Sequence, residues 1–323
     1  MTDPILKLDH VSKQFSDQLG VADVSLTVND GEFFVLVGSS GSGKTTTLRM
    51  INRLIEPSSG TITFHGKNTA EYNLRELRTS IGYVLQDIAL FPNMTVQQNV
   101  SLIPEMRGKD KKATKLLAEQ LLREVDLDPE QYLQKMPADL SGGEQQRVGI
   151  LRAFAANPKL ILMDEPFSAL DPISRRQLRE LVKKIHENTH STIIFVTHDM
   201  DEALELGDKI AVMRLGKVEQ IGSPSEIVST PANDFVAKMF SKSLAHDIYG
   251  VYLNKLALMG YLTQDKKTTA TVPSIEETAT VGDVLSLINQ AGEVKIMRGQ
   301  ISAGYLTQSE LLRFMADFQK AHR

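Results

Sequence analysis

The chain lacks cysteine entirely and carries no marked excess of one charge, with 36 basic and 40 acidic residues among its 323. The absence of cysteine excludes disulfides, metal–thiolate sites and thiol catalysis, and it fits a reducing compartment. Acidic and basic residues are interspersed, so the net charge of -4 provides no basic footprint for nucleic acid. No apolar run approaches the roughly 18 residues of a membrane span, and we expect no signal peptide. These features predict a soluble protein with one large and one small domain.

A glycine-rich segment follows the apolar run Phe33–Val37 and fits the phosphate-binding pattern G-x-x-x-x-G-K-[ST] in full. Its residues are Gly38, Ser39, Ser40, Gly41, Ser42, Gly43, Lys44 and Thr45, followed by Thr46. Glycines let the backbone wrap around a phosphate chain, while the loop N–H groups and the following helix start attract anions. The pattern predicts that Lys44 reaches the β- and γ-phosphates and that the Thr45 hydroxyl binds Mg²⁺. The alternative is a plain turn between a strand and a helix.

Three further apolar runs end in polar residues that nucleotide chemistry can use. They are Ile81–Leu85 before Gln86, Leu160–Met163 before Asp164 and Glu165, and Ile193–Thr197 before His198. Short apolar runs are typical of buried parallel strands, whose carboxyl ends form the ligand-binding edge of a sheet. We therefore expect Lys44 and these polar residues to meet at one edge, although a single histidine is more often structural.

A second motif, Leu140-Ser-Gly-Gly-Glu144-Gln-Gln-Arg147, opens a helix with a turn rich in serine and glycine. A helix start of this kind attracts anions, and an early glutamate suits the positive end of the helix dipole. Alone, the motif indicates only a helix cap. It gains weight because Leu160–Glu165 and Ser168-Ala-Leu-Asp171 follow it along the chain.

In their order, these motifs resemble those of the ATP-binding-cassette (ABC) ATPases, a likeness that covers about residues 5 to 240. The resemblance implies an α/β P-loop fold with a mixed-sheet core, an antiparallel β subdomain and an inserted helical subdomain. It also implies a homodimer whose two cassettes pair head to tail. In that arrangement Ser141 and Gly143 of one subunit, with Gly142 and Glu144 in the same binding segment, close over ATP held by the other. Glu144 stands where the commonest family motif has glutamine.

Further roles follow from the same resemblance. Glu165 would polarise the attacking water, His198 would contact the γ-phosphate, and Gln86 would link metal, water and the membrane partner. With Lys44, these residues form the catalytic group. The implied cofactors are ATP and Mg²⁺, and the metal-binding residues would be Thr45, Gln86 and Asp164.

Two other assignments depend on the resemblance as well. Asp171 would support the facing ATP site across the dimer. Phe15 would stack on adenine, and the alternative is a core or strand-edge phenylalanine.

Outside the motifs, the patterns separate two regions of the larger domain. Residues 5 to 37 alternate apolar and polar positions around a turn at Asn29–Gly31, which predicts antiparallel strands. Between Val96 and Leu140, apolar residues recur every three or four positions, which predicts the helical subdomain. We interpret the lysines of Lys109–Lys112 as a solvated face.

The predicted domains are residues 1 to 240 and residues 241 to 323. In the second we expect a helix over 281–288, a hairpin from 293–297 and 301–306, and a helix over 308–319. This order resembles one module of the cystathionine-β-synthase (CBS) type, which ATPases of compatible-solute importers carry as a regulatory tail. Gly260–Gln264 repeats Gly304–Gln308, either as a decayed first module or by coincidence, and residues 266–271 do not show the expected helical pattern.

A single small module buries little surface, so we expect it to pair with the tail of the other subunit. The resemblance makes cyclic di-AMP a candidate ligand of this tail, and the alternative is a dimerisation element that binds nothing.

Gln86–Thr95 and Pro231–Val236 resemble the ATPases of importers for glycine betaine, carnitine and choline. We therefore predict the ATP-hydrolysing subunit of such an importer, peripheral to the cytoplasmic face of the membrane. A permease and a substrate-binding protein are its expected partners, and no nucleic acid is. One alternative is a soluble cassette protein acting on nucleic acid or ribosomes, which usually has two cassettes or a long coiled coil. The other is an exporter ATPase, against which the separate tail argues.

Overall fold

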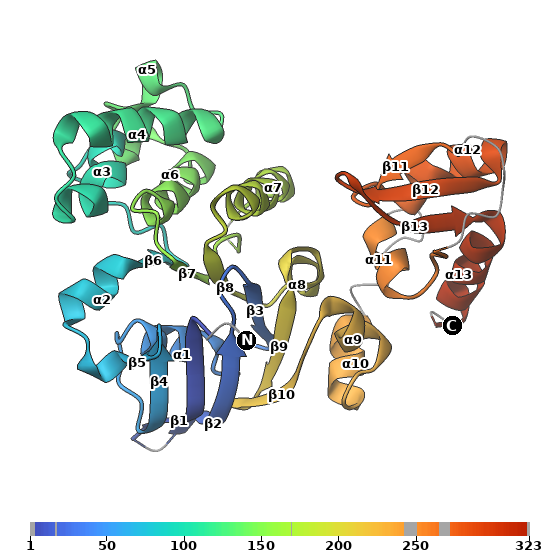
Figure 1. Cartoon of the computed structure of the whole chain (residues 1–323), viewed down its shortest axis with the longest axis horizontal. Helices are drawn as coiled ribbons and strands as arrows, with labels where there is room; N and C mark the ends of the chain where they lie inside the picture. The colour runs from blue at the N-terminus through green and yellow to red at the C-terminus, as the bar shows by residue number, and fades with distance from the viewer. Residues whose placement is uncertain (1–3, 17, 169, 242–250, 265–271, 322–323) are drawn as a thin grey trace. The chain divides into compact units, whose positions relative to one another are not determined.

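The computed structural model describes residues 4–16, 18–168, 170–241, 251–264 and 272–321 (Figure 1). Its contacts divide the chain into two compact units, Met1–Ile221 and Gly222–Arg323. This division lies before the predicted boundary at residue 240, because α9 (Pro224–Ser229) contacts both α10 (Asp234–Ser241) and α11 (Leu253–Leu258). None of the described helices is long and apolar enough to cross a membrane.

A six-stranded sheet, in the order β10-β9-β3-β8-β7-β6, forms the centre of the first unit. Its strands are β3 (Phe33–Gly38), β6 (Ile81–Val84), β7 (Leu160–Asp164), β8 (Thr192–Thr197), β9 (Lys209–Arg214) and β10 (Lys217–Gly222). All pairings from β9 to β6 are parallel. Every residue of β3, β7 and β8 is buried, which explains why these strands appear in the sequence as continuous apolar runs. Their carboxyl ends share one edge, as predicted.

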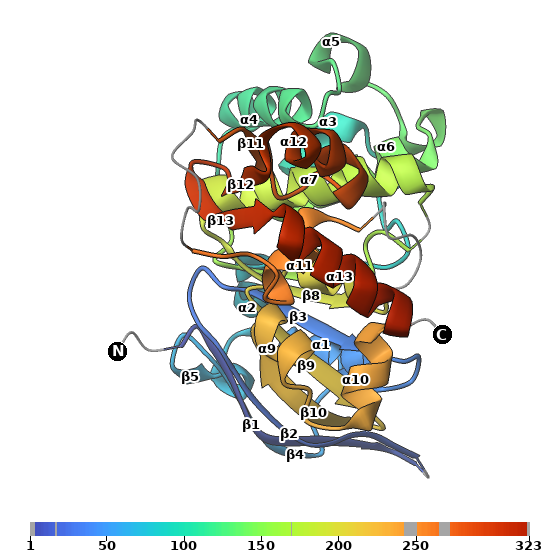
Figure 2. The same cartoon turned by 90° about the vertical axis from the view of Figure 1, so that its right-hand side faces the viewer.

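A second, four-stranded sheet has the order β2-β1-β4-β5, with antiparallel pairings (Figure 2). Its strands are β1 (Leu6–Phe15), β2 (Gln18–Val28), β4 (Ser59–Phe64) and β5 (Lys67–Asn68). Along β2 the side chains of Val24, Leu26 and Val28 are buried and those between them are exposed. This alternation is the signature of a sheet with one solvated face, so the predicted antiparallel β subdomain is present.

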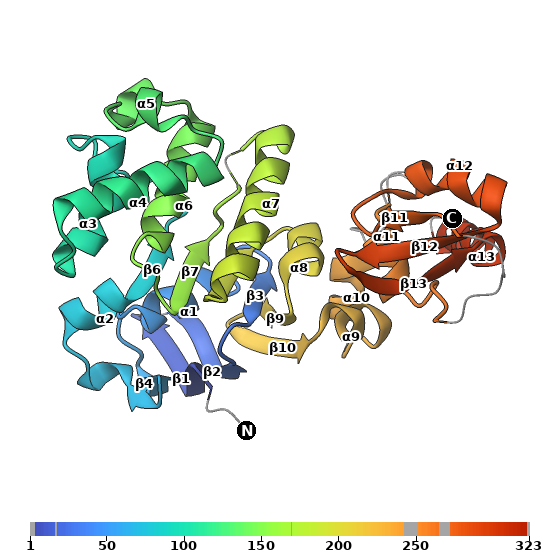
Figure 3. The same ribbon diagram turned by 45° about the horizontal axis from the view of Figure 1, so that its top comes forward.

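The helical region expected between Val96 and Leu140 is also present (Figure 3). The helices of the first unit are α1 (Lys44–Ile51), α2 (Leu74–Ser80), α3 (Val96–Met106), α4 (Lys111–Glu124), α5 (Pro129–Tyr132), α6 (Gly142–Phe154), α7 (Pro172–Thr189) and α8 (Met200–Leu206), with 3₁₀ turns at Thr69–Glu71 and Pro137–Asp139. The side chains of Thr95, Asp110 and Asp128 cap α3, α4 and α5. Helix α3 contacts α4 and α6.

The second unit contains the predicted tail. Its further elements are β11 (Ser274–Glu276), α12 (Val281–Ala291), β12 (Glu293–Arg298), β13 (Ile301–Thr307) and α13 (Gln308–Ala321). The three strands form a sheet in the order β11-β12-β13, in which β12 pairs parallel to β11 and antiparallel to β13. The predicted helices and hairpin are therefore confirmed. Residues 266–271 lie outside the described residues, and the likeness to a CBS module stays a prediction.

Candidate functional site

The phosphate loop has the backbone conformation that its glycines allow. Gly41 and Gly43 adopt φ angles of 74° and 101°, in the left-handed region. Gly38 is required for a different reason, because a Cβ atom there would lie 2.3 Å from the carbonyl oxygen of Met213. A Cβ on Gly43 would likewise lie 2.7 Å from the carbonyl oxygen of Gly20. Strands β2 and β9 thus support the loop from outside.

Lys44 lies under this loop with only 4% of its surface exposed. Its Nζ donates to the carbonyl oxygens of Gly38 and Ser39, at 2.8 and 3.0 Å. Burial lowers the pKa of the amine, while Glu165 and Asp164 act in the opposite direction. The hydroxyl oxygen of Ser42 is buried and has no hydrogen-bond partner.

Helix α1 begins at Lys44 without a side-chain cap at Gly43 and without an acidic residue in its first turn. Its first N–H groups and its dipole are therefore available to an anion. The loop glycines, the buried lysine and the unpartnered Ser42 hydroxyl also suit an anion. Together they fit a phosphate chain.

The predicted metal-binding residues Thr45 and Asp164 lie side by side. Thr45 Oγ1 donates to Asp164 Oδ1 at 2.8 Å. Asp164, at the end of β7, is 2% exposed, and burial raises the pKa of its carboxyl. A hydroxyl and a carboxylate are oxygen ligands that suit Mg²⁺, which usually takes few protein ligands and completes its shell with phosphate and water. The described residues contain no group of three or more acidic or histidine side chains that could hold a metal by itself.

Glu165 and His198 also meet at this edge. His198 Nδ1 donates to Glu165 Oε2 at 2.8 Å. The Glu165 backbone has φ 46°, an uncommon conformation for a residue other than glycine, and its N–H donates to the carbonyl oxygen of Val196 at 3.0 Å. Strand β8 therefore holds Glu165 in a strained conformation, as is common at functional sites.

Behind His198 lies a set of contacts that the sequence pattern did not indicate. Thr197 Oγ1 donates to Glu202 Oε2 at 2.6 Å and accepts from the Asp199 N–H at 2.9 Å. Glu202 is 4% exposed, and burial raises its pKa to about 7. Arg175 of α7 contacts Asp199 at 3.8 Å and donates to the carbonyl oxygen of Leu170.

Arg175, Thr197, Asp199 and Glu202 line a small cavity together with Glu165 and His198. The sequence signals for this set are the acidic residues at the start of α8, Asp199, Asp201 and Glu202, which by themselves indicate no more than a favourable helix start.

The serine–glycine motif starts α6, and no hydrogen bond among the described residues joins it to the phosphate loop. A capping box forms between Ser141 and Glu144. Gly142 has no atom near the position of a Cβ, and the nearest neighbour of Gly143 is Ser174 of α7. The structure thus leaves this predicted group apart from Lys44 within the single chain.

The other predicted site residues are placed as follows. Gln86 follows β6 and is exposed, and Thr46 is half-buried in α1. Asp171 accepts from the Ser174 N–H at the start of α7. Phe15 is 43% exposed and lies against Gly20, so it is not a core residue. Its contact with adenine stays a prediction.

Comparison with known proteins adds independent findings. A family profile described as "ABC transporter" matches residues 21–168. The glycine betaine/carnitine/choline transport ATP-binding protein OpuCA of Bacillus subtilis is 52% identical over 239 residues, covering 74% of this chain. The choline transport ATP-binding protein OpuBA of the same organism is 50% identical over 239 residues. This chain spans 63% and 62% of those two relatives.

A third relative is matched over nearly its whole length. The glycine betaine uptake system ATP-binding protein YehX of Escherichia coli is 40% identical over 289 residues, covering 89% of this chain and 92% of that protein. Among solved structures, a dimeric ATP-binding cassette in a post-hydrolysis state bound to ADP and Pi is 33% identical with a TM-score of 0.62. The match covers 68% of this chain and 98% of the chain in that solved structure. The chain therefore belongs to the family of ABC transporter ATP-binding proteins.

Proposed function

We propose that this chain is the ATP-hydrolysing subunit of an importer for quaternary-amine osmoprotectants such as glycine betaine, carnitine or choline. The observation that carries the proposal is the meeting of Lys44, Thr45, Asp164, Glu165 and His198 at the carboxyl edge of the central sheet. The names of the relatives support import of these solutes over both alternatives, export and action on nucleic acid or ribosomes.

In this proposal the phosphate loop binds ATP. Lys44 would exchange its contacts with two backbone carbonyls for the β- and γ-phosphates, and Ser42 would gain a partner. Thr45 and Asp164, with Gln86, would hold Mg²⁺, which when bound would neutralise charge on the phosphate oxygens. Phe15, exposed at the end of β1, would offer its ring to adenine.

Glu165 is the residue that we assign to the attacking water. Its carboxylate would accept a hydrogen bond from the water and aim it at the γ-phosphate, because phosphoryl transfer depends mainly on positioning and charge. The contact with His198 holds the Glu165 side chain in place. With Nδ1 bonded to Glu165, His198 would contact the γ-phosphate through its other ring nitrogen, Nε2.

The separation of Ser141–Glu144 from the phosphate loop supports a composite site. We propose that two copies pair head to tail, so that Ser141 and Gly143 of one copy reach the γ-phosphate in the other. Asp171 would support the site across this interface. A permease and a substrate-binding protein complete the assembly, and the permease would hold the cassette at the cytoplasmic face of the membrane.

We propose that residues after 241 regulate transport. The tail would act by pairing with a second copy, and a small nucleotide such as cyclic di-AMP is a candidate ligand.

The test is a pair of substitutions with different expected effects. Glu165→Gln keeps the shape of the side chain but removes its charge, so turnover should fall about 10²–10³-fold while ATP still binds. Lys44→Ala should instead weaken ATP binding itself, because it removes the buried cation. Normal turnover in the Glu165→Gln chain would refute the assignment. Co-purification with an integral permease tests the transport part separately.

A further inference from the structure

The hydroxyl group of Ser141 donates its only proton within its own chain. Ser141 Oγ donates to Glu144 Oε2 at 2.8 Å, and the Ser141 backbone N–H donates to the same oxygen at 2.7 Å. A hydroxyl has one proton, so it cannot donate to Glu144 and to a phosphate oxygen at the same time. Ser141 is exposed, so a phosphate can approach it. A hydrogen bond from the hydroxyl to that phosphate, however, requires the bond to Glu144 to break first.

The carboxylate that holds this proton is fixed from its other side. Tyr132, the last residue of α5, donates its hydroxyl to Glu144 Oε1 at 2.5 Å. This bond, more than those from Ser141, lowers the pKa of Glu144 to about 2. Lys135 Nζ lies 3.8 Å from the centre of the Tyr132 ring. Glu144 is therefore fully charged at neutral pH, and α5 holds it beside Ser141.

We propose that the charged carboxylate of Glu144, which accepts a hydrogen bond from Tyr132, is a brake on closure of the ATP site, an inference that rests on the head-to-tail dimer proposed above. The charged carboxylate retains the Ser141 proton and repels the γ-phosphate of ATP bound to a second copy. Closure then requires the hydroxyl to turn from Glu144 to the phosphate. Glu144 and Tyr132 act through Ser141 and are positioning residues.

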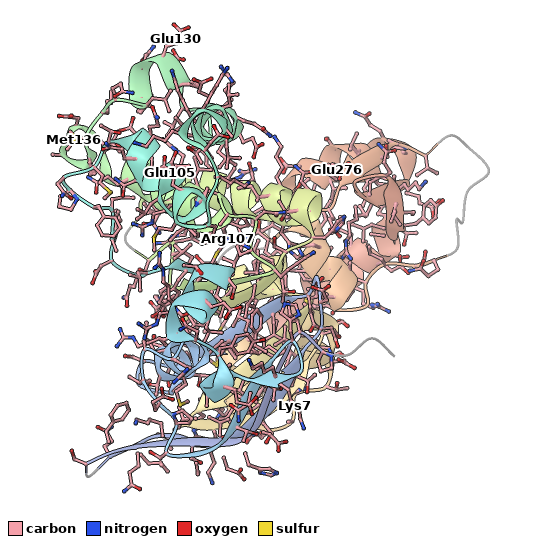
Figure 4. The ribbon with its side chains drawn as sticks, turned by 60° about the vertical axis from the view of Figure 1, so that its left-hand side comes forward. Lys7, Glu105, Arg107, Glu130, Met136 and Glu276 are labelled. Carbon is pink, nitrogen blue, oxygen red and sulfur yellow. The ribbon has the colours of Figure 1, made fainter. Side chains whose placement is uncertain are left out.

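Glu144→Gln isolates the charge. The amide oxygen of glutamine can still accept from the Ser141 N–H, as in other capping boxes, and its NH₂ group can donate to the Tyr132 oxygen. Tyr132→Phe is the complementary variant, because it keeps the charge and removes the hydrogen bond. Glu130→Gln is the matched control for the loss of one negative charge in Glu144→Gln. Glu130 is an exposed carboxylate on α5, the helix that carries Tyr132 (Figure 4).

The experiment measures dimerisation of the full-length chain with ATP and Mg²⁺ by sedimentation velocity, with Glu165→Gln in every variant to prevent turnover. Glu144→Gln should tighten the dimer about three- to tenfold, because a charge-assisted hydrogen bond is replaced by a weaker neutral one. The difference should shrink at higher salt, which screens the repulsion. Glu130→Gln should leave the affinity unchanged, and Tyr132→Phe should not tighten the dimer.

Three results would overturn the inference. In the first, Glu144→Gln dimerises no more tightly than the chain with Glu144. In the second, Tyr132→Phe tightens the dimer as much as Glu144→Gln, so that loosening of the motif and not its charge is responsible. In the third, no variant dimerises with ATP, which would refute the head-to-tail site itself and the brake with it.

Discussion

Substitution of Glu202 by glutamine should stabilise the chain above neutral pH. Glu202 is 4% exposed, and Thr197 Oγ1 donates to it at 2.6 Å. Glutamine keeps the acceptor oxygen for Thr197 and removes the need to bury a charge. Burial is the main cause of the raised pKa of Glu202, and Asp199 raises it further. The hydrogen bond from Thr197 and the charges of Arg179 and Arg175 act in the opposite direction.

The expected size of the effect follows from the pKa. Burial raises the pKa of Glu202 from 4.5 to about 7, and each unit corresponds to about 1.4 kcal/mol. The folded chain therefore binds this proton more tightly than the unfolded chain, and stability falls as pH rises through the window from 4.5 to about 7. Below that window the carboxyl is neutral in both states. Above it, the penalty levels off at about 3 kcal/mol, so Glu202→Gln should gain up to that amount.

The assay is urea unfolding followed by far-ultraviolet circular dichroism at several pH values, because the chain has no tryptophan to report by fluorescence. Glu180→Gln is the control, since Glu180 pairs with Arg176 on the surface of α7, where ion pairs contribute little. The stability gained by Glu202→Gln should grow with pH and that of the control should stay flat. A gain that does not change with pH, or a loss of stability above neutral pH, would refute the reasoning.

Two further predictions concern the dimer and the tail. Ser141→Arg should bind ATP but neither dimerise nor hydrolyse it, and mixing with Lys44→Ala should restore at most one composite site per heterodimer; full activity of Ser141→Arg as a monomer, measured by phosphate release, would contradict the shared site. Truncation after Ser241, at the end of α10, should leave basal ATP hydrolysis largely unchanged while altering the response of transport to ionic strength or to a small ligand, which reconstitution in vesicles would measure.

The sequence predicts the convergence of the site because the evidence is local. Continuous apolar runs mark β3, β7 and β8, and the polar residue after each run must lie at the same edge once the strands are parallel. This argument places Lys44, Asp164 and His198 correctly. Local patterns also predict the tail, where amphipathic periods mark α12 and α13.

The layer around the site could not be predicted in this way. The contact between Tyr132 and Glu144 joins two helices, and the contact between Thr197 and Glu202 depends on how deeply α8 is buried. In neither pair does the sequence spacing of the two residues distinguish them from ordinary surface residues. For the same reason, composition does not reveal that α9 contacts α11, and the domain boundary at residue 240 stays a prediction.

The internal hydrogen bonds of the site also govern how strongly it can bind a phosphate or a metal ion. Lys44 and Asp164 are almost fully buried, and a buried charge without a partner is too costly to persist. The fold therefore provides partners: two carbonyl oxygens for Lys44, and the Thr45 hydroxyl for Asp164. A phosphate or a metal ion must replace these bonds, so its net gain is the difference between two satisfied arrangements. The buried Ser42 hydroxyl is different, because it has no partner in the structure and a phosphate contact there would add a hydrogen bond without breaking another.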